Sequence, residues 1–166
     1  MKKILSMVFI FLSIFPMSVT TFAEEQSALK EIPSAIIVGE KKFDINDFHY
    51  PPYYEGNSLM VPLRKIGEAL GYTIEWDSQT GAITIDDNYI QKATLYDGTA
   101  TIVFEGHLKV IDMSRKIEST ERTVIHNGYT FVPLELFKEF FNDTIIRENE
   151  IEITPSKSEL QSLDIS

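Results

Sequence analysis

Two short stretches of the chain carry apolar residues at the spacing of a helix that covers a core. One follows Pro62 and the other follows Pro133, and in each the apolar positions recur every three to four residues, which gathers them on one helix face. Proline fits the first helical position, where its missing N–H would be unpaired in any case. Gly71 and Asn142 follow where a left-handed residue would end each helix. The pattern predicts two helices of about two to three turns.

Short strand patterns flank both predicted helices. Runs with alternating or continuous apolar character are separated by turns that contain glycine or clustered polar residues, which is typical of β-hairpins. We expect a further strand from about Tyr89 to Leu95, ended by the turn signal Asp97-Gly98. The paired runs are AIIV with KKFDI, YTIEW with AITI, TIVF with HLKVI, and TIIR with IEIT.

The two halves of the chain resemble each other. A shift of 71 residues places VPL at 61–63 on VPL at 132–134 and carries Thr73 onto Thr144. Self-similarity at a fixed shift indicates a repeated structural unit. Each half then follows the same order of strand, strand, loop, helix, strand and strand.

This organisation predicts an α+β fold made of two pseudo-repeated units, each a short helix packed on antiparallel β-strands. Repeat one spans about 35–87 and repeat two about 88–153. Polar stretches without a clear period precede and follow this domain, at 24–34 and 154–166. We expect both to be flexible.

The N-terminus has the features of a signal peptide. Lys2 and Lys3 precede an apolar run, and the small-residue pattern at 21–23 stands directly before Glu24. The run is shorter than the roughly 20 residues of a spanning helix. We therefore expect residues 1–23 to be cleaved and the mature chain to be secreted or associated with the cell wall, without stable membrane insertion. Retention of the leader as a membrane anchor stays open as the alternative.

Composition excludes several classes of function. The chain has no cysteine, and its net charge is −10. Disulfides and thiolate metal sites are therefore impossible. Removal of the leader takes away two lysines, which leaves 25 acidic against 15 − 2 = 13 basic residues, a balance of −12. So acidic a chain is poorly suited to bind nucleic acid or anionic lipid.

A longer motif carries a family resemblance. MVPLRKIGEALGYTIEWDSQTGAITI and, less closely, HNGYTFVPLELFKEFFNDTIIRENEIEI resemble the copper amine oxidase N-terminal-like domain, also called the stalk domain, over about Ala35 to Ile153. The resemblance implies an antiparallel sheet twisted around a helix, exported proteins of Gram-positive bacteria, and an accessory role without catalytic residues. The second motif departs from the pattern, since Glu135 stands where the first has Arg64 and Asn142 where the first has a glycine.

The sequence offers little support for metal or catalytic chemistry. Copper prefers imidazole and sulfur ligands, but His49, His107 and His126 lack the close spacing of a metal motif. A copper site assembled from distant residues is a remote alternative. Asp86-Asp87-Asn88 lacks the glycine and distal glutamate of a calcium loop, so we interpret it as a turn. Neither the G-x-S-x-G nor the H-E-x-x-H hydrolase motif occurs, and we predict neither enzyme activity nor a cofactor.

The most unusual stretch is FHYPPYYEG, from Phe48 to Gly56. Its tyrosines, Tyr50, Tyr53 and Tyr54, are the candidate ligand contacts, because rigid aromatic rings on a stiff loop can stack on sugars or hold a protein partner. The structural alternative is that these rings seal one end of a small sheet. Arg64, at the start of the first predicted helix, is expected to pair with an acid such as Glu68 rather than to anchor a ligand.

These observations predict an exported, non-catalytic structural or interaction module at the bacterial cell surface. Its partner would be an unknown surface protein or a cell-wall glycan. The main alternative is a glycan-binding module that uses the aromatic loop from Phe48 to Tyr54.

Overall fold

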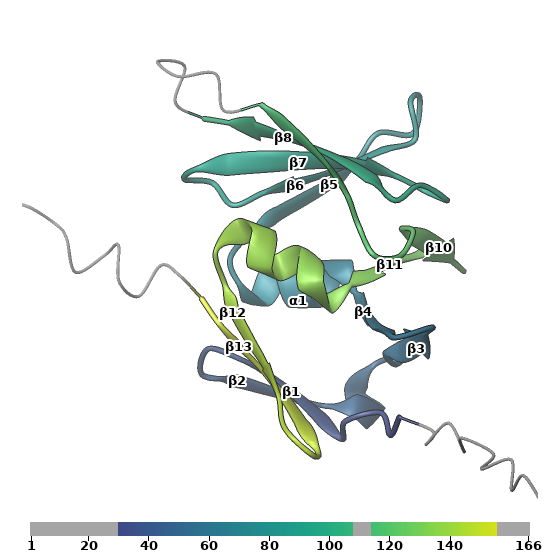
Figure 1. The fold of residues 1–166 in the computed structure, drawn as a ribbon, viewed down its shortest axis with the longest axis vertical. Coiled ribbons are helices and arrows are strands. Elements are labelled where there is room, and N and C mark those ends of the chain that lie inside the picture. The colour runs from purple at the N-terminus through teal and green to yellow at the C-terminus, as the bar shows by residue number, and fades with distance from the viewer. Residues whose placement is uncertain (1–29, 108–113, 156–166) are drawn as a thin grey trace, which may run out of the picture.

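Three small β-sheets form the body of the protein. The computed structural model describes residues 30–107 and 114–155, of which 48% lie in strands and 14% in helices. The sheets are arranged one above another, and the helical segments that follow β4 and β11 lie between the outer two (Figure 1). We name them sheet A, in the order β12-β13-β1-β2, sheet B, in the order β10-β11-β4-β3, and sheet C, in the order β5-β6-β7-β8-β9.

The elements are short and follow one another closely along the chain. The strands of the first half are β1 Ala35–Val38, β2 Lys41–Asp44, β3 Tyr53–Glu55, β4 Ser58–Pro62, β5 Thr73–Trp76 and β6 Ala82–Asp86. Those of the second half are β7 Gln91–Tyr96, β8 Thr101–Gly106, β9 Arg115–Glu118, β10 Val124–His126, β11 Tyr129–Pro133, β12 Asp143–Ile146 and β13 Glu150–Thr154. The helices are α1 Leu63–Ala69 and two 3-10 segments, η1 Ile45–Asp47 and η2 Leu134–Phe140.

The expected α+β fold of two helix-on-strand units is wrong. The protein is mostly β-sheet, and two of its sheets take strands from both halves of the chain. Sheet A places β1 beside β13, and sheet B places β4 beside β11. The physical reason is that a hairpin of two short strands cannot bury its apolar face alone. Each half therefore completes a sheet that the other half begins.

Sheet B is built around a local two-fold relation. β4 and β11 pair antiparallel at its centre, and Val61 lies opposite Val132, its own counterpart in the other half. Both valines are fully buried. β3 and β10 flank this central pair on opposite sides. All five residues of β4 are buried, so the pairing of β4 with β11 is the centre of the molecule.

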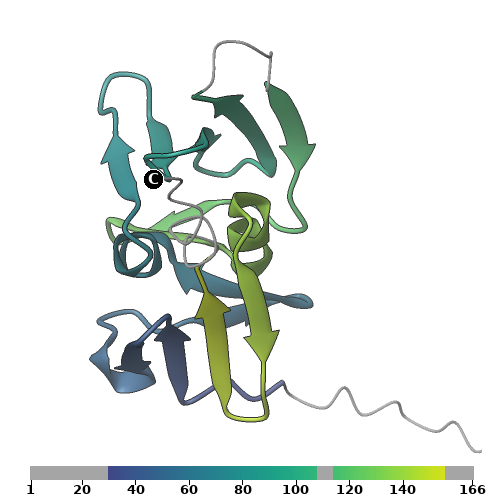
Figure 2. The ribbon, with the colours of Figure 1, turned by 90° about the vertical axis from the view of Figure 1, so that its left-hand side faces the viewer.

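Sheet A joins the first and last strands of the described chain. β1 runs parallel to β13, with Ile36 opposite Ile151, and neither side chain is exposed. Just before β1, the Ser34 N–H donates to the carbonyl oxygen of Asn149 at 2.8 Å. In Figure 2 the purple β1 and the yellow β13 lie side by side at the lower end of the molecule. This arrangement leaves β2 and β12 as the two edges of sheet A.

The two helices begin alike and end differently. Pro62 and Pro133 are extended residues that precede α1 and η2, so each proline is the last residue of a strand rather than the first helical position. Gly71 has the expected left-handed conformation, with φ of 80°. In the second half the left-handed residue is Phe141, with φ of 63°, and the expectation that Asn142 fills this position is wrong. The 3-10 segment reaches its left-handed residue one position sooner than the α-helix.

Because of this one-residue difference, the residues after the two helices correspond at a shift that is one residue smaller than expected. Thr73 begins β5 opposite Asp86, and Asp143 begins β12 opposite Thr154. Thr73 therefore corresponds to Asp143, and its expected match with Thr144 is wrong by one residue. Tyr72 and Asn142 become counterparts by the same count.

The counterparts Tyr72 and Asn142 bind one another inside the core. The Asn142 side-chain amide donates to the Tyr72 hydroxyl at 2.7 Å and to the Phe137 carbonyl at 2.8 Å. Both residues are buried, at 6% and 3% exposure. The Tyr72 ring also lies 5.3 Å from that of Phe140. A polar link of this kind fixes the two helix ends relative to each other.

Most of the predicted hairpins are confirmed. β1 pairs with β2, β5 with β6 and β12 with β13, each antiparallel, and the extra strand is present as β7. The predicted strand HLKVI lies largely outside the described residues, and β8 pairs with β9. The predicted signal peptide at 1–23 also lies outside them, as do 24–29 and 156–166. Neither α1 nor the 3-10 segments of the described ranges has the length and apolarity that a membrane crossing requires.

Burial of Tyr72 should make the fold sensitive to high pH. Burial raises its pKa from 10.0 to about 12, the Asp87 charge adds to the rise, and the bond from Asn142 opposes it. The folded state favours the neutral phenol of Tyr72 more strongly than the unfolded chain does. This contribution to the free energy of unfolding is complete below about pH 10 and is lost as the pH rises through about 12. Urea unfolding should show a loss of about 3 kcal/mol across this window.

Tyr72→Phe should reduce that pH dependence and lower the stability at neutral pH by about 1 kcal/mol, because the Asn142 amide loses one acceptor. Tyr96→Phe, at a side chain that is 42% exposed, is the control and should keep the wild-type pH profile. An unchanged profile in Tyr72→Phe would show that other groups cause the loss.

Candidate functional site

A hollow of about 380 Å³ opens between α1, β5 and the turn that joins β10 to β11. We call it the aromatic pocket. His49 and Tyr50 enter it from the loop after η1, and Tyr129 enters from the start of β11. Arg64 and Glu68 line it from α1, and its other walls include Asp47, Lys65, Ile74 and Glu75. Apolar walls with a few converging polar groups are typical of small-molecule and sugar sites.

Aromatic rings form one wall of the pocket. The Tyr50 and Tyr129 rings lie 4.9 Å apart, and the His49 ring stacks on Tyr129 at 5.7 Å with an angle of 27° between the planes. Tyr129 is 43% exposed, so part of its face is open to a ligand. Tyr50 is held in place, because its hydroxyl accepts a hydrogen bond from the Asn127 side-chain amide at 3.0 Å.

The turn between β10 and β11 positions Tyr129. Asn127 and Gly128 both have positive φ, at 50° and 81°, as a type I′ hairpin turn requires. The turn pairs His126 with Tyr129 across the hairpin, and the His126 ring lies edge-on to Tyr50 at 5.6 Å. Loop and hairpin therefore support each other through ring contacts.

Charged side chains of α1 form the opposite wall. One terminal nitrogen of Arg64 donates to the Ile74 carbonyl of β5 at 3.1 Å and lies 3.4 Å from Glu68. The predicted ion pair with Glu68 is therefore present, although both side chains are more than half exposed and the pair contributes little stability. The other Arg64 N–H groups make no hydrogen bond to the described residues, so they are available to a polar ligand.

The three tyrosines proposed as ligand contacts occupy different surroundings. Tyr50 lines the aromatic pocket and also a neighbouring hollow of about 300 Å³. Tyr53 lines only that second hollow, where its ring packs on Phe131 at 5.3 Å. Tyr54 lines neither hollow and lies beneath the Lys30 ammonium at 5.4 Å. Phe48 also lines the aromatic pocket, but it is buried, at 7% exposure, with the Lys65 ammonium over its ring at 4.1 Å.

Tyr129 and Glu75 belong to the pocket but were not predicted from the sequence. Tyr129 lies 79 positions beyond Tyr50, since 129 − 50 = 79, and only the fold of sheet B brings them together. The dipeptide Asn127-Gly128 was the available signal, because it predicts a tight hairpin and places Tyr129 at a strand start. It could not reveal which ring that tyrosine would meet.

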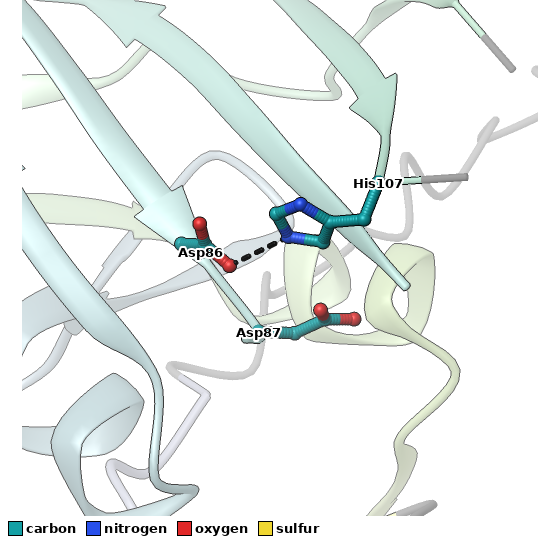
Figure 3. Close-up of side chains that lie close together, drawn as sticks. All are labelled: Asp86, Asp87 and His107. Carbon is teal, nitrogen blue, oxygen red and sulfur yellow. Dashed lines mark hydrogen bonds and ion pairs between the residues drawn. The ribbon is translucent and has the colours of Figure 1, made fainter. Parts of the chain in front are cut away.

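A second group of polar side chains lies at the end of β6. Asp86, Asp87 and His107 bring one ligand atom each to within 4.8 Å of the others (Figure 3). The His107 ring nitrogen Nε2 lies 2.9 Å from Asp86 Oδ1. The Asp87 carboxylate lies just below this pair in the view of Figure 3.

The hydrogen bonds of Asp87 give it a structural role in the turn after β6. Its Oδ1 accepts from the backbone N–H groups of Tyr89, Ile90 and Gln91, at 2.8, 2.8 and 3.0 Å. The residue is only 4% exposed. A carboxylate so occupied holds the turn between β6 and β7, in agreement with the turn predicted for Asp86-Asp87-Asn88.

Comparison with known proteins settles the family. A family model described as "Copper amine oxidase N-terminal domain" matches residues 38–154, which is most of the chain. The protein belongs to this family. The resemblance seen in the VPLR motif is thereby confirmed. No curated protein and no solved structure matches the chain.

Membership of the copper amine oxidase N-terminal domain family supports a stalk-like, non-catalytic module. The described residues do not fit copper, despite the name. Their one cluster of potential metal ligands contains a single imidazole beside two carboxylates, whereas copper sites favour several imidazoles or sulfur ligands. Met60 is fully buried in sheet B, and Met113 lies outside the described residues.

Removal of the Asp87 carboxylate tests whether it holds the turn. Asp87→Ala should lower the free energy of unfolding by about 2 to 3 kcal/mol, because three backbone N–H groups in a partly buried turn lose their acceptor. Asp86→Ala, which removes an acceptor from one N–H group and from His107, should have the smaller effect.

Thermal unfolding with and without added Ca²⁺ or Zn²⁺ tests whether the group formed by Asp86, Asp87 and His107 binds a metal. A large rise in midpoint that Asp87→Ala abolishes would show that the group is a metal site.

Proposed function

We propose that the protein is an exported, non-catalytic structural and interaction module that works at the bacterial cell surface. The observation that carries this proposal is the family match over residues 38–154, which spans nearly all of the folded part. The two halves interlock through sheets A and B, which favours a rigid body over two independently moving units. Rigid, site-poor bodies suit a role in spacing or holding other components.

Export rests on the leader sequence at 1–23, which has two lysines, an apolar run and small residues before Glu24. Mass spectrometry of the protein from medium and cell-wall fractions should find a chain that begins near Glu24. Ala23→Tyr should slow cleavage, because signal peptidase sites require small residues. Ala28→Tyr is the matched control and should be processed normally. An intact chain from Met1 in the cell interior would contradict export.

Glycan binding is the second candidate, and the geometry of the aromatic pocket favours it. Tyr129 presents a partly exposed ring opposite Arg64 and Glu68. Sugars are commonly held by a ring face on one side and by charged or planar hydrogen-bonding groups on the other. The same loop that suggested a glycan site in the sequence contributes Tyr50 to this wall. The ligand class would be a cell-wall glycan.

Co-sedimentation with purified peptidoglycan tests this second function. Tyr129→Ala should weaken binding about tenfold, since the loss of one ring contact corresponds to about 1.4 kcal/mol. Tyr96→Ala removes a ring of nearly equal exposure on β7, 42% against 43% for Tyr129, and should bind like wild type. If Tyr53→Ala with Tyr54→Ala abolishes binding and Tyr129→Ala does not, the aromatic pocket is not the site.

A further inference from the structure

The edge strand β12 has unused backbone hydrogen-bonding groups. β13 covers one side of β12, and the other side is the margin of sheet A (Figure 2). The Arg147 N–H donates to the Glu150 carbonyl at 2.8 Å where the hairpin closes. Because hydrogen-bonded and open positions alternate along antiparallel strands, Thr144 and Ile146 direct their N–H and C=O groups to the free margin. No described residue binds those groups.

β12 carries two large exposed apolar side chains, in contrast to the edge strands β2 and β9. Ile145 and Ile146 are 47% and 53% exposed. The opposite edge of sheet A, β2, carries Lys41 and Lys42, and the edge β9 of sheet C carries basic residues in the same way. Charged residues on edge strands prevent pairing with another chain. β12 contains no lysine or arginine, and its one charged residue is Asp143 at the strand start.

The first half of the chain protects its corresponding edge, and the second half does not. Arg64 of α1 donates to the Ile74 carbonyl on the free margin of β5. At the same helix position the second half has Glu135, and a carboxylate has no proton to donate to a carbonyl. Next to β12, Phe141 takes the left-handed position that is glycine in the first half and is 56% exposed. A bulky residue is strained in that conformation.

We propose that β12 pairs antiparallel with β12 of a second copy of this chain. Centred on Ile145, this register sets Thr144 opposite Ile146 of the second copy, so the free N–H and C=O groups of both strands bind each other. Asp143 then lies opposite Arg147 of the second copy, at a position where antiparallel side chains approach most closely. The charges are complementary on both sides of the two-fold axis. The same surface is used by both copies, as closed dimers require.

The pairing extends sheet A from one copy into the next. Only one short strand from each copy takes part, so the contact is smaller than the roughly 1,200 Å² of a stable interface. We therefore expect a weak dimer whose population depends on concentration. This proposal does not depend on export or on the aromatic pocket, so its test is separate from the tests of those two proposals.

Sedimentation equilibrium of the full chain tests the surface. Wild type should show a concentration-dependent dimer, and Ile145→Lys should weaken it about tenfold or more, because two lysines would meet at the axis. Val103→Lys changes an exposed residue of the interior strand β8 and should leave the dimer unchanged. A protein that is monomeric at all concentrations overturns the proposal, as does association that Ile145→Lys leaves intact.

Reversal of the two charges, one in each variant, tests the register. A small loss of stability in either variant does not affect the conclusion, because the mixture is compared with each variant alone. Asp143→Arg alone and Arg147→Asp alone should each weaken self-association about tenfold, because like charges then face each other twice. An equimolar mixture of the two variants should dimerise as wild type does, since each new charge meets its opposite. Arg147 also binds Glu152 in its own chain, at 2.9 Å, a contact that mixing does not restore. Failure of the mixture to associate overturns the proposed register.

Discussion

The pairing of β4 with β11 determines the rest of the structure. These strands place Val61 opposite Val132, so each half of the chain meets the matching part of the other half at a buried centre. α1 and η2 leave this centre directly, since each follows the end of its strand. The hairpins β5–β6 and β12–β13 then diverge into sheets C and A. The aromatic pocket depends on the same constraint, because it lies where the loop before β3 meets the β10–β11 turn beside α1.

Much of the local structure could be predicted from the sequence, but the fold class could not. Alternating patterns located most hairpins, Gly71 has the left-handed conformation expected after α1, and Pro62 lies one residue before the helix rather than at its first position. Periodicity identifies which residues face a core and says nothing about which strand lies next to which. The α+β expectation was wrong because it kept each helix with its own strands, whereas short hairpins gain more burial by joining across halves. The misplaced end at Asn142 has a separate cause, because the pattern of apolar residues does not distinguish a 3-10 segment from an α-helix.

The candidate site was predictable to the same limited degree. The unusual composition of FHYPPYYEG correctly drew attention to Tyr50, which lines the pocket. Sequence proximity also suggested Tyr53 and Tyr54, but successive residues of a strand point to opposite faces, so the three rings could not share one site. Tyr129 was missed because its nearness to Tyr50 is a property of sheet B. The ion pair of Arg64 with Glu68 was predicted correctly. The hydrogen bond from Arg64 to β5 could not be predicted, because the sequence does not show how α1 lies relative to that strand.

The parallel pairing of β1 with β13 has a consequence for how the molecule is made. Ser34 and Asn149, which bind each other beside these strands, are separated by 115 positions. A strand that appears early in synthesis therefore waits for nearly the last one before its sheet can close, and such long-range contacts slow folding. Until then Ile36 stays without its partner. Sheet A therefore cannot be completed until β13 is present, although β1 and β2 are adjacent in sequence and can pair earlier.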